Sequence, residues 1–564
     1  MYNLLHERWI PVKRKTGEKP VYISPSQITD GLATNPIIAL AAPRPDFNGA
    51  LIQFLIGLMQ TAFPPKDEPE WQKKFRNPPL PDELKVAFER YANAFNLDGD
   101  GPRFMQDLDP HLLKTKPKEK KSKEKEKMEF PIEELILEMP GDITKQEDRD
   151  FFLKRGTVKI ICPACCAAAL YTLQTHAPSG GPGYRVSIRG GSPLTTIVLG
   201  RTLWETVWLN VVDKTTFLQY GNASKNADPD KFPWMGHTRT SENDEKTTFH
   251  DVNGAQMFWG MPWRIRILFE HSKNGEKCDI CGCSADSMVH TFYKTNYGVN
   301  YKGGWYHTLT PYAEGRKTEN NSLIPFQSEL NGVSYRNWLG LIQHNPNEKI
   351  RPAKVVHLFR EERKDDLKDF GLSSTRLWAF GYKIVKGRKV VCWNDSIMPL
   401  ITVGSDISQE YESSIFQLIV SAEMIKEKLR ECIREAILSK KSKLKPNLSF
   451  VELQFWQETE STFYQTINEL HIALQSNTFF DLSNTRKKWL DYLQRTALSS
   501  FDRYSQWDQI ISTTNPRRIV DARINLRKFL YGNNNLYAML DLEKPEKSTK
   551  SRQKNSKKME PAIS

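Results

Sequence analysis

The spacing of hydrophobic residues changes near Gly404. Beyond it, apolar side chains recur every three or four residues, which predicts amphipathic helices. The first run contains Ile415, Leu418, Ile419, Ala422, Ile425, Leu429 and Ile433. Similar runs cover 450–474, 482–506 and 517–531, with Pro446 and the Asn515-Pro516 pair between them. Four such segments with short connections predict a C-terminal four-helix bundle over residues 405–542.

Residues 1–404 mix strand and helix patterns. Short runs rich in β-branched and aromatic residues predict strands at 9–12, 21–23, 194–199 and 264–269, and two strands within 379–393. The apolar stretch within 48–63 predicts a buried helix, because its longest apolar run is too short to span a bilayer and contains Gln53. The predicted fold class is therefore α+β, a large mixed N-terminal domain followed by the helical bundle.

The chain of 564 residues carries a net charge of +13, and two lysine-rich segments supply nine of those charges. Segment 114–127 holds eight Lys and three Glu, and segment 543–564 holds seven basic and three acidic residues. Neither composition can bury a core, so we expect a mobile insertion and a disordered basic tail. The remainder is only mildly basic, so charge alone does not establish a nucleic-acid partner.

The first fifteen residues place charges inside every apolar stretch, unlike a signal peptide. Eight cysteines do not make a dense disulfide framework, and their clustering suits a reducing compartment. We therefore expect a cytoplasmic protein with no membrane partner.

Two Cys-x-x-Cys pairs, Cys162 with Cys165 and Cys278 with Cys281, offer four thiolates. Four thiolates suit tetrahedral Zn²⁺ and leave no open position for water, so the predicted zinc is structural. Cys166 and Cys283 are neighbouring alternative ligands. The long gap between the pairs leaves a second interpretation open, in which they are unrelated thiols.

A glycine-rich loop, Ser179-Gly180-Gly181-Pro182-Gly183, follows the first cysteine pair. It matches neither a P-loop nor a dinucleotide-binding fingerprint. Glycines can present bare backbone to a ligand, and the nearby Arg185 and Arg189 suggest a phosphate-rich one. A plain connector is the alternative.

No hydrolase, metalloprotease or nucleotide-binding motif occurs in the sequence. His250, Asp251 and His290 lie near the second cysteine pair in sequence, but their spacing fits no established template. We therefore predict that the protein is not an enzyme. A zinc-containing nuclease using these residues is the first alternative.

Several segments resemble the CasA family, the large subunits of the type I-E CRISPR effector complex, Cascade. They are the opening 3–12 with 24–28 behind it, the block 176–183, then 194–198 and 209–210. The cysteine pairs and the C-terminal helices follow in the same order. The resemblance covers nearly the whole chain except 114–127 and the tail after about Glu543.

This resemblance implies a recognition subunit that reads the protospacer-adjacent motif of double-stranded target DNA, mainly from the minor groove. It also implies duplex opening, R-loop formation with the guide RNA, and recruitment of a helicase–nuclease in antiviral defence. The implied partners include the other Cascade subunits: backbone, small helical and guide-end-binding.

The family's functional positions map unevenly onto this chain. Its glycine loop corresponds to Ser179–Gly183, and its minor-groove lysine corresponds to Lys294. The family's duplex wedge corresponds to Ser374, Thr375 and Arg376, with Arg in place of the usual Gln. The loop Pro140-Gly141-Asp142-Ile143-Thr144 resembles the segment that contacts the guide and the complex.

A second alternative is a general basic scaffold that binds RNA through its lysine-rich segments. Deleting 114–127 and the tail would then abolish binding. Under the recognition hypothesis the same deletion lowers affinity and leaves motif discrimination intact.

Overall fold

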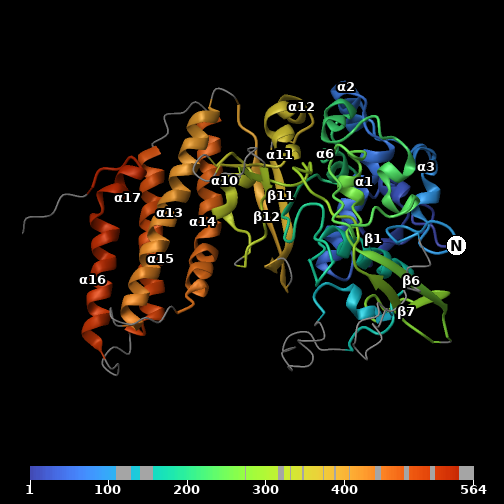
Figure 1. The fold of residues 1–564 in the computed structure, drawn as a ribbon. Coiled ribbons are helices and arrows are strands. Elements are labelled where there is room, and N and C mark those ends of the chain that lie inside the picture. Colours follow the sequence, from blue (N-terminus) through green and yellow to red (C-terminus); the bar gives the residue numbers. More distant parts are fainter. Residues whose placement is uncertain are drawn as a thin grey trace, which may run out of the picture. The chain divides into compact units, whose positions relative to one another are not determined.

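The computed structural model describes residues 1–108, 129–139, 156–273, 275–314, 323–330, 332–345, 349–372, 374–386, 389–404, 407–438, 446–475, 482–507 and 515–544. The chain divides into two compact units, Met1–Val403 and Gly404–Ser564 (Figure 1). The lysine-rich insertion and the loop Pro140–Thr144 lie outside the described residues, as does most of the basic tail.

The described part of the first unit contains four small antiparallel sheets of three strands each. Their strand orders are β2-β1-β3, β10-β8-β9, β12-β11-β5 and β4-β7-β6. The strands are β1 (Ile10–Arg14), β2 (Val21–Ile23), β3 (Ile37–Leu40), β4 (Glu129–Pro131), β5 (Thr195–Leu199), β6 (Arg264–His271), β7 (Ser287–Thr295), β8 (Tyr312–Glu314), β9 (Leu323–Pro325), β10 (Ile350–Arg351), β11 (Ser374–Val385) and β12 (Lys389–Ile401).

Helices alternate with these strands along the described part of the first unit. They are α1 (Pro45–Ala62), α2 (Glu68–Arg76), α3 (Pro81–Glu89), α5 (Pro163–Thr175), α6 (Leu203–Leu209), α7 (Lys214–Phe217), α8 (Asp228–Lys231), α9 (Gln256–Trp259), α10 (Trp338–Leu341), α11 (Lys354–His357) and α12 (Lys364–Asp369). Helix α1 is buried on almost every face, as its unbroken apolar stretch predicts.

The core of the first unit is built around Phe54 of α1. Five aromatic rings meet it edge-on with centroids 5.3–5.9 Å away: Trp9, Phe95, Phe104, Tyr171 and Trp259. Edge-to-face packing is the favoured geometry for aromatic pairs, so these rings fix α1 against β1, α5 and α9. Helix α5 carries the first cysteine pair, and the residues after it form the glycine loop. The core therefore positions both candidate sites.

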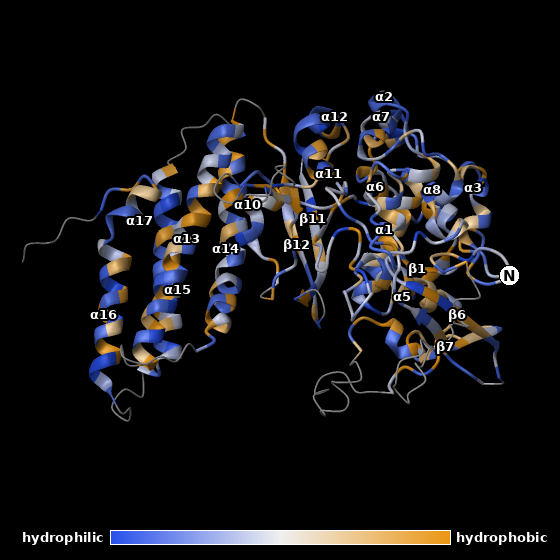
Figure 2. Cartoon of the chain, in the orientation of Figure 1, coloured by the Kyte–Doolittle hydropathy of each residue, from blue (hydrophilic) through white to orange (hydrophobic). Residues whose placement is uncertain are grey.

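The second unit is helical in its described part: α13 (Ser408–Ile437), α14 (Ser449–Gln475), α15 (Leu482–Tyr504), α16 (Pro516–Gly532) and α17 (Asn534–Met539). Figure 2 shows apolar and polar residues alternating along the four long helices. Trp489 Nε1 of α15 donates to the Leu418 carbonyl of α13 over 3.1 Å, and both side chains are buried. The prediction of a mixed α+β chain with a helical C-terminal region is confirmed.

None of the described helices combines the length and apolar character that crossing a bilayer requires.

Candidate functional site

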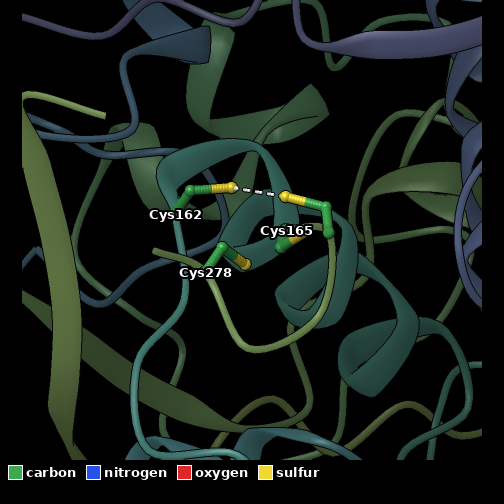
Figure 3. Close-up of side chains that lie close together, drawn as sticks. Cys162, Cys165 and Cys278 are labelled. Atoms are coloured by element: carbon green, nitrogen blue, oxygen red, sulfur yellow. Dashed lines mark hydrogen bonds between the residues drawn. The ribbon is translucent and has the colours of Figure 1, made fainter. Parts of the chain in front are cut away.

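The four predicted metal ligands converge although 119 positions separate Cys162 from Cys281. Cys162 is the N-cap of α5, and Cys165 lies in that helix's first turn. Cys278 and Cys281 come from the segment between β6 and β7, and Figure 3 shows the cluster. Their four sulfur atoms all lie within 4.8 Å of one another.

Backbone bonds hold the two cysteine segments together. The amides of Lys159 and Ile160 both donate to Asp279 Oδ2, over 2.7 and 2.9 Å. The Asp279 amide donates to the Ile160 carbonyl over 2.9 Å, and Ile161 pairs with Val289 of β7. These bonds fix the approach of the second pair to the start of α5.

The spacing of the sulfurs fits one tetrahedral ion. A metal–sulfur bond of about 2.3 Å gives sulfur–sulfur separations of about 3.8 Å. The Sγ atoms of Cys162 and Cys281 are 3.6 Å apart, and all four cysteines are free thiols. Cys166 and Cys283 are not members of this group. The four cysteines can therefore hold one metal ion, each supplying one sulfur ligand.

The glycine loop presents its tip to solvent, with Gly180 and Pro182 exposed. Gly180 and Gly183 have φ of +55° and +79°, the left-handed region that favours glycine. A Cβ on Gly183 would lie 2.9 Å from Asn296 Cβ, so that position is closed to larger residues. At Gly181 a Cβ would meet only Tyr184, at 3.8 Å. Gly180 and Gly181 thus present bare backbone at the tip, with open space in front of Gly181 and the exposed Pro182 next in the chain.

Trp263 connects the glycine loop to Lys294. Its Nε1 donates to the carbonyls of Pro178 and Arg185, each over 3.1 Å, and its ring lies 5.9 Å from the Lys294 ammonium. The ammonium also pairs with Glu134 over 2.7 Å and lies 3.9 Å from the Phe130 ring. The structure thus brings Lys294 and the loop together, with the lysine side chain only 13% exposed and already paired with Glu134.

Two residues beside Lys294, Asn296 and Tyr297, also contact the glycine loop, and neither was predicted from the sequence. The Tyr297 amide donates to the Gly183 carbonyl over 2.8 Å, and Asn296 Nδ2 lies 3.5 Å from the Pro182 carbonyl. No motif marks Asn296 or Trp263 in the sequence. Their only signal is position, because both flank the strands that carry the predicted site.

The two arginines near the loop do not serve as free cations. Arg185 donates to the Ser241 hydroxyl and carbonyl over 2.8 and 3.0 Å. Arg189 is 2% exposed and donates to Gln53, Thr195 and Thr310, and burial lowers its pKa to about 10. The expectation that Arg189 faces a phosphate-rich ligand was wrong, because its guanidinium is buried in the core and donates there to three neutral oxygens.

His176, which begins the glycine-loop segment, is a buried neutral imidazole. It is fully buried, contacts the rings of Tyr382 and Trp393, and neither ring nitrogen has a hydrogen-bond partner among the described residues. Burial, followed by the charge of Arg189, lowers its pKa well below the ordinary value. As the pH falls below about 6.5, His176 therefore becomes protonated in the unfolded chain but not in the folded chain, which lowers the stability of the fold.

We expect His176→Phe to reduce the acid sensitivity of the fold. Between pH 7 and pH 5 the free energy of unfolding of the wild type should fall by about 2 kcal/mol more than that of the variant. The reason is that His176 gains a proton in the unfolded chain but stays neutral in the folded chain. Denaturant unfolding at the two pH values measures this difference. The exposed His237→Gln serves as the control and should behave like the wild type. Equal acid sensitivity in the His176→Phe variant would contradict the assignment.

The predicted wedge residues lie at the start of β11, in the centre of a three-stranded sheet. Arg376 stands between Leu199 of β5 and Pro399 of β12, and its side chain is exposed. Thr375 donates its hydroxyl to the Leu199 carbonyl. These positions belong to a strand rather than a turn, and the β11–β12 hairpin reverses direction at the opposite end of both strands.

The histidines of the nuclease alternative do not assemble a centre. Asp251 is engaged by the amide and hydroxyl of Thr248, over 2.7 and 2.8 Å, which lowers its pKa. His290 lies on β7, 3.9 Å from Glu276. Within the described ranges, the four cysteines are the one group of three or more ligand side chains close enough to share a metal.

A family comparison gives the relationship of this chain to known proteins. The model of the CRISPR-associated protein Cse1 family matches residues 3–500. The chain belongs to the CasA/Cse1 family. The resemblance inferred from the glycine-loop segment and the opening residues is therefore confirmed.

Solved CasA/Cse1 structures share the fold at low sequence identity. CasA of Thermus thermophilus is 15% identical, with a TM-score of 0.66, and the match covers 94% of this chain and 99% of that one. Cse1 of Acidimicrobium ferrooxidans is 15% identical, with a TM-score of 0.67 and coverages of 96% and 99%. A chain of a structure described as a CRISPR RNA-guided surveillance complex is 14% identical, with a TM-score of 0.64 and coverages of 94% and 99%.

Proposed function

We propose that this protein is the large subunit of a type I-E Cascade surveillance complex and recognises the protospacer-adjacent motif in double-stranded DNA. The observation that carries the proposal is the glycine backbone presented at the tip of the loop, in a chain of the CasA/Cse1 family. The minor groove is narrow and chemically degenerate, so backbone atoms can enter it where side chains would clash. Lys294 and the loop, joined through Trp263, form the reading surface.

The remaining steps follow from that role. Duplex opening begins beside Ser374, Thr375 and Arg376, where the exposed guanidinium can bind a phosphate or stack on an unpaired base. Sequence reading beyond the motif is left to pairing with guide RNA in the R-loop. The protein docks the helicase–nuclease and has no catalytic centre of its own. The four long C-terminal helices form the bundle that contacts the small helical subunits.

The cysteine cluster holds a structural zinc ion in this proposal. Four thiolates with tetrahedral spacing suit Zn²⁺, and a closed shell offers no reactive water. Cys162, Cys165, Cys278 and Cys281 would hold the ion. The ion would tie the start of α5 to the β6–β7 segment. Helix α5 leads into the glycine loop, and the β6–β7 segment leads into β7, which carries Lys294.

The deciding experiment compares the reconstituted guide-RNA complex with and without this chain. Duplex targets are identical except for a randomised flanking motif. The proposal expects motif-dependent binding only when the chain is present. A complete complex that binds without regard to the motif, with or without the chain, would refute it.

The ion pair between Glu134 and Lys294 supplies a further prediction. Lys294 must release Glu134 before it reaches a groove, so we expect Glu134→Gln to raise DNA affinity about two- to fivefold and to steepen the salt dependence by about one phosphate contact. Lys294→Ala should lower affinity and motif dependence. Salt titrations of duplex binding by the reconstituted complex measure both effects.

Glu138→Gln is the matched control, because it removes the same charge from a carboxylate that pairs with Arg44 instead, over 2.9 Å. An equal rise in affinity for both glutamine variants would mean that overall charge, and not release of Lys294, is responsible.

A further inference from the structure

One cavity of the first unit lies outside the glycine loop and the cysteine cluster and shares no lining residue with them. Its volume is about 570 Å³. That is within the roughly 300–1,000 Å³ typical of small-molecule sites. We call it the tyrosine cavity, after its lining residues Tyr220, Tyr306 and Tyr312.

One tyrosine ring of this cavity, Tyr312, is held in place by hydrogen bonds, and another, Tyr306, is exposed to solvent. Tyr312 is buried; its hydroxyl donates to the Trp305 carbonyl over 2.8 Å and accepts from the His307 amide over 2.6 Å. The Tyr306 ring lies 5.5 Å from that of Tyr312 and 6.4 Å from that of Tyr220, and Tyr306 is 36% exposed. An exposed ring supported by a fixed one presents a stacking surface for a flat aromatic ligand.

Cations stand at the same cavity. Arg351 and Lys354 both line it. Arg351 pairs with Glu314 over 2.8 Å, but Lys349 shares that carboxylate at 3.5 Å. Lys354 pairs with Glu362 over 2.7 Å. Three permanent cations thus face two carboxylates, and the Glu314 pairs are solvent-exposed and therefore weak, so a phosphate can compete for them.

Exposed aromatic rings can stack on a base, and the additional cation can pair with a phosphate, so together they fit a nucleotide. We propose that the tyrosine cavity binds one unpaired nucleotide of a single strand, with its base on Tyr306 and its phosphate on Arg351 and Lys354. Base–aromatic stacking tolerates every base, so the site binds without sequence preference. This function goes beyond motif reading, and none of these residues takes part in the glycine-loop surface.

The test uses the full chain alone, without guide RNA or a flanking motif. A fluorescent single-stranded DNA of about eight nucleotides is titrated against the wild type, Tyr306→Ala and Tyr306→Phe. We expect Tyr306→Ala to weaken binding about 5- to 150-fold and Tyr306→Phe to stay within about twofold, because only the ring is needed. Tyr531→Ala, which removes an exposed tyrosine from α16 in the other unit, is the matched control.

A photoreactive iodouracil version of the oligomer should crosslink to Tyr306, identified by peptide mass spectrometry. Binding by Tyr306→Ala as tight as that by Tyr306→Phe would overturn the proposal, as would crosslinks confined to other regions. Thymidine monophosphate binding as tightly as the oligomer would assign the cavity to free nucleotides and overturn the single-strand assignment. Because no duplex or motif is present, these outcomes are independent of whether the chain reads a flanking motif.

Discussion

The Cys278→Ser variant is expected to lose its bound metal and to unfold more than about 10 °C below the wild type. A structural zinc contributes its binding free energy to folding, which amounts to roughly 10–16 kcal/mol in small zinc domains. A metal ion held by the four cysteines would join segments that lie 119 positions apart, so its loss would free the start of α5 from the β6–β7 segment. Elemental analysis and thermal unfolding of the purified chain measure the two effects.

Two cysteines outside the cluster serve as controls. Cys283→Ser alters an exposed thiol next to the cluster, and Cys392→Ser alters a half-buried thiol on β12. Both variants should retain one metal ion per chain. If Cys278→Ser fails to fold, a strong chelator added to the wild type provides the same test. A wild type that carries no metal as purified, and whose melting temperature the chelator leaves unchanged, would eliminate the site.

Local patterns were sufficient to predict several elements of the fold. The predicted strands at 21–23 and 264–269 are present as β2 and β6, and the predicted helix within 48–63 is α1. Strand pairing was beyond the sequence, since β11 pairs with β5 across about 180 positions. Alternation within a strand tells which face is buried, but not which distant strand lies beside it.

Among the candidate site residues, local spacing identified some, and only the fold revealed the surroundings of others. The four cysteines were identifiable because the Cys-x-x-Cys spacing presents both sulfurs to one ion. Arg189 was misread because a charged residue is ordinarily exposed, and only the fold brings Gln53, Thr195 and Thr310 to its donors. Trp263 was missed because a single tryptophan carries no spacing signal, although it contacts the residues that flank the glycine loop and lies near Lys294.

Gly181→Asp is expected to abolish motif discrimination while leaving the fold intact. Gly181 lies outside the left-handed region, and a Cβ there meets nothing closer than 3.8 Å, so the substitution costs little stability. The new carboxylate would project from the bare tip toward the groove and repel the phosphates on either side. We expect the preference for the correct motif to fall about 10- to 100-fold in the reconstituted complex, with an unchanged melting temperature.

Substitutions at two other glycines serve as controls for the loss of discrimination: Gly101→Asp tests the added charge, and Gly183→Ala tests backbone strain. Gly101→Asp adds the same charge at an exposed glycine with no atom within 4 Å of its Cβ position, so it should keep full discrimination. Gly183→Ala should lower the melting temperature, because its φ of +79° and its contact with Asn296 both disfavour a side chain. Discrimination by Gly181→Asp equal to that of Gly101→Asp would show that the glycine tip does not approach the DNA. The reading surface would then have to be sought around Lys294 and Asn296, where side chains and not backbone atoms would enter the groove.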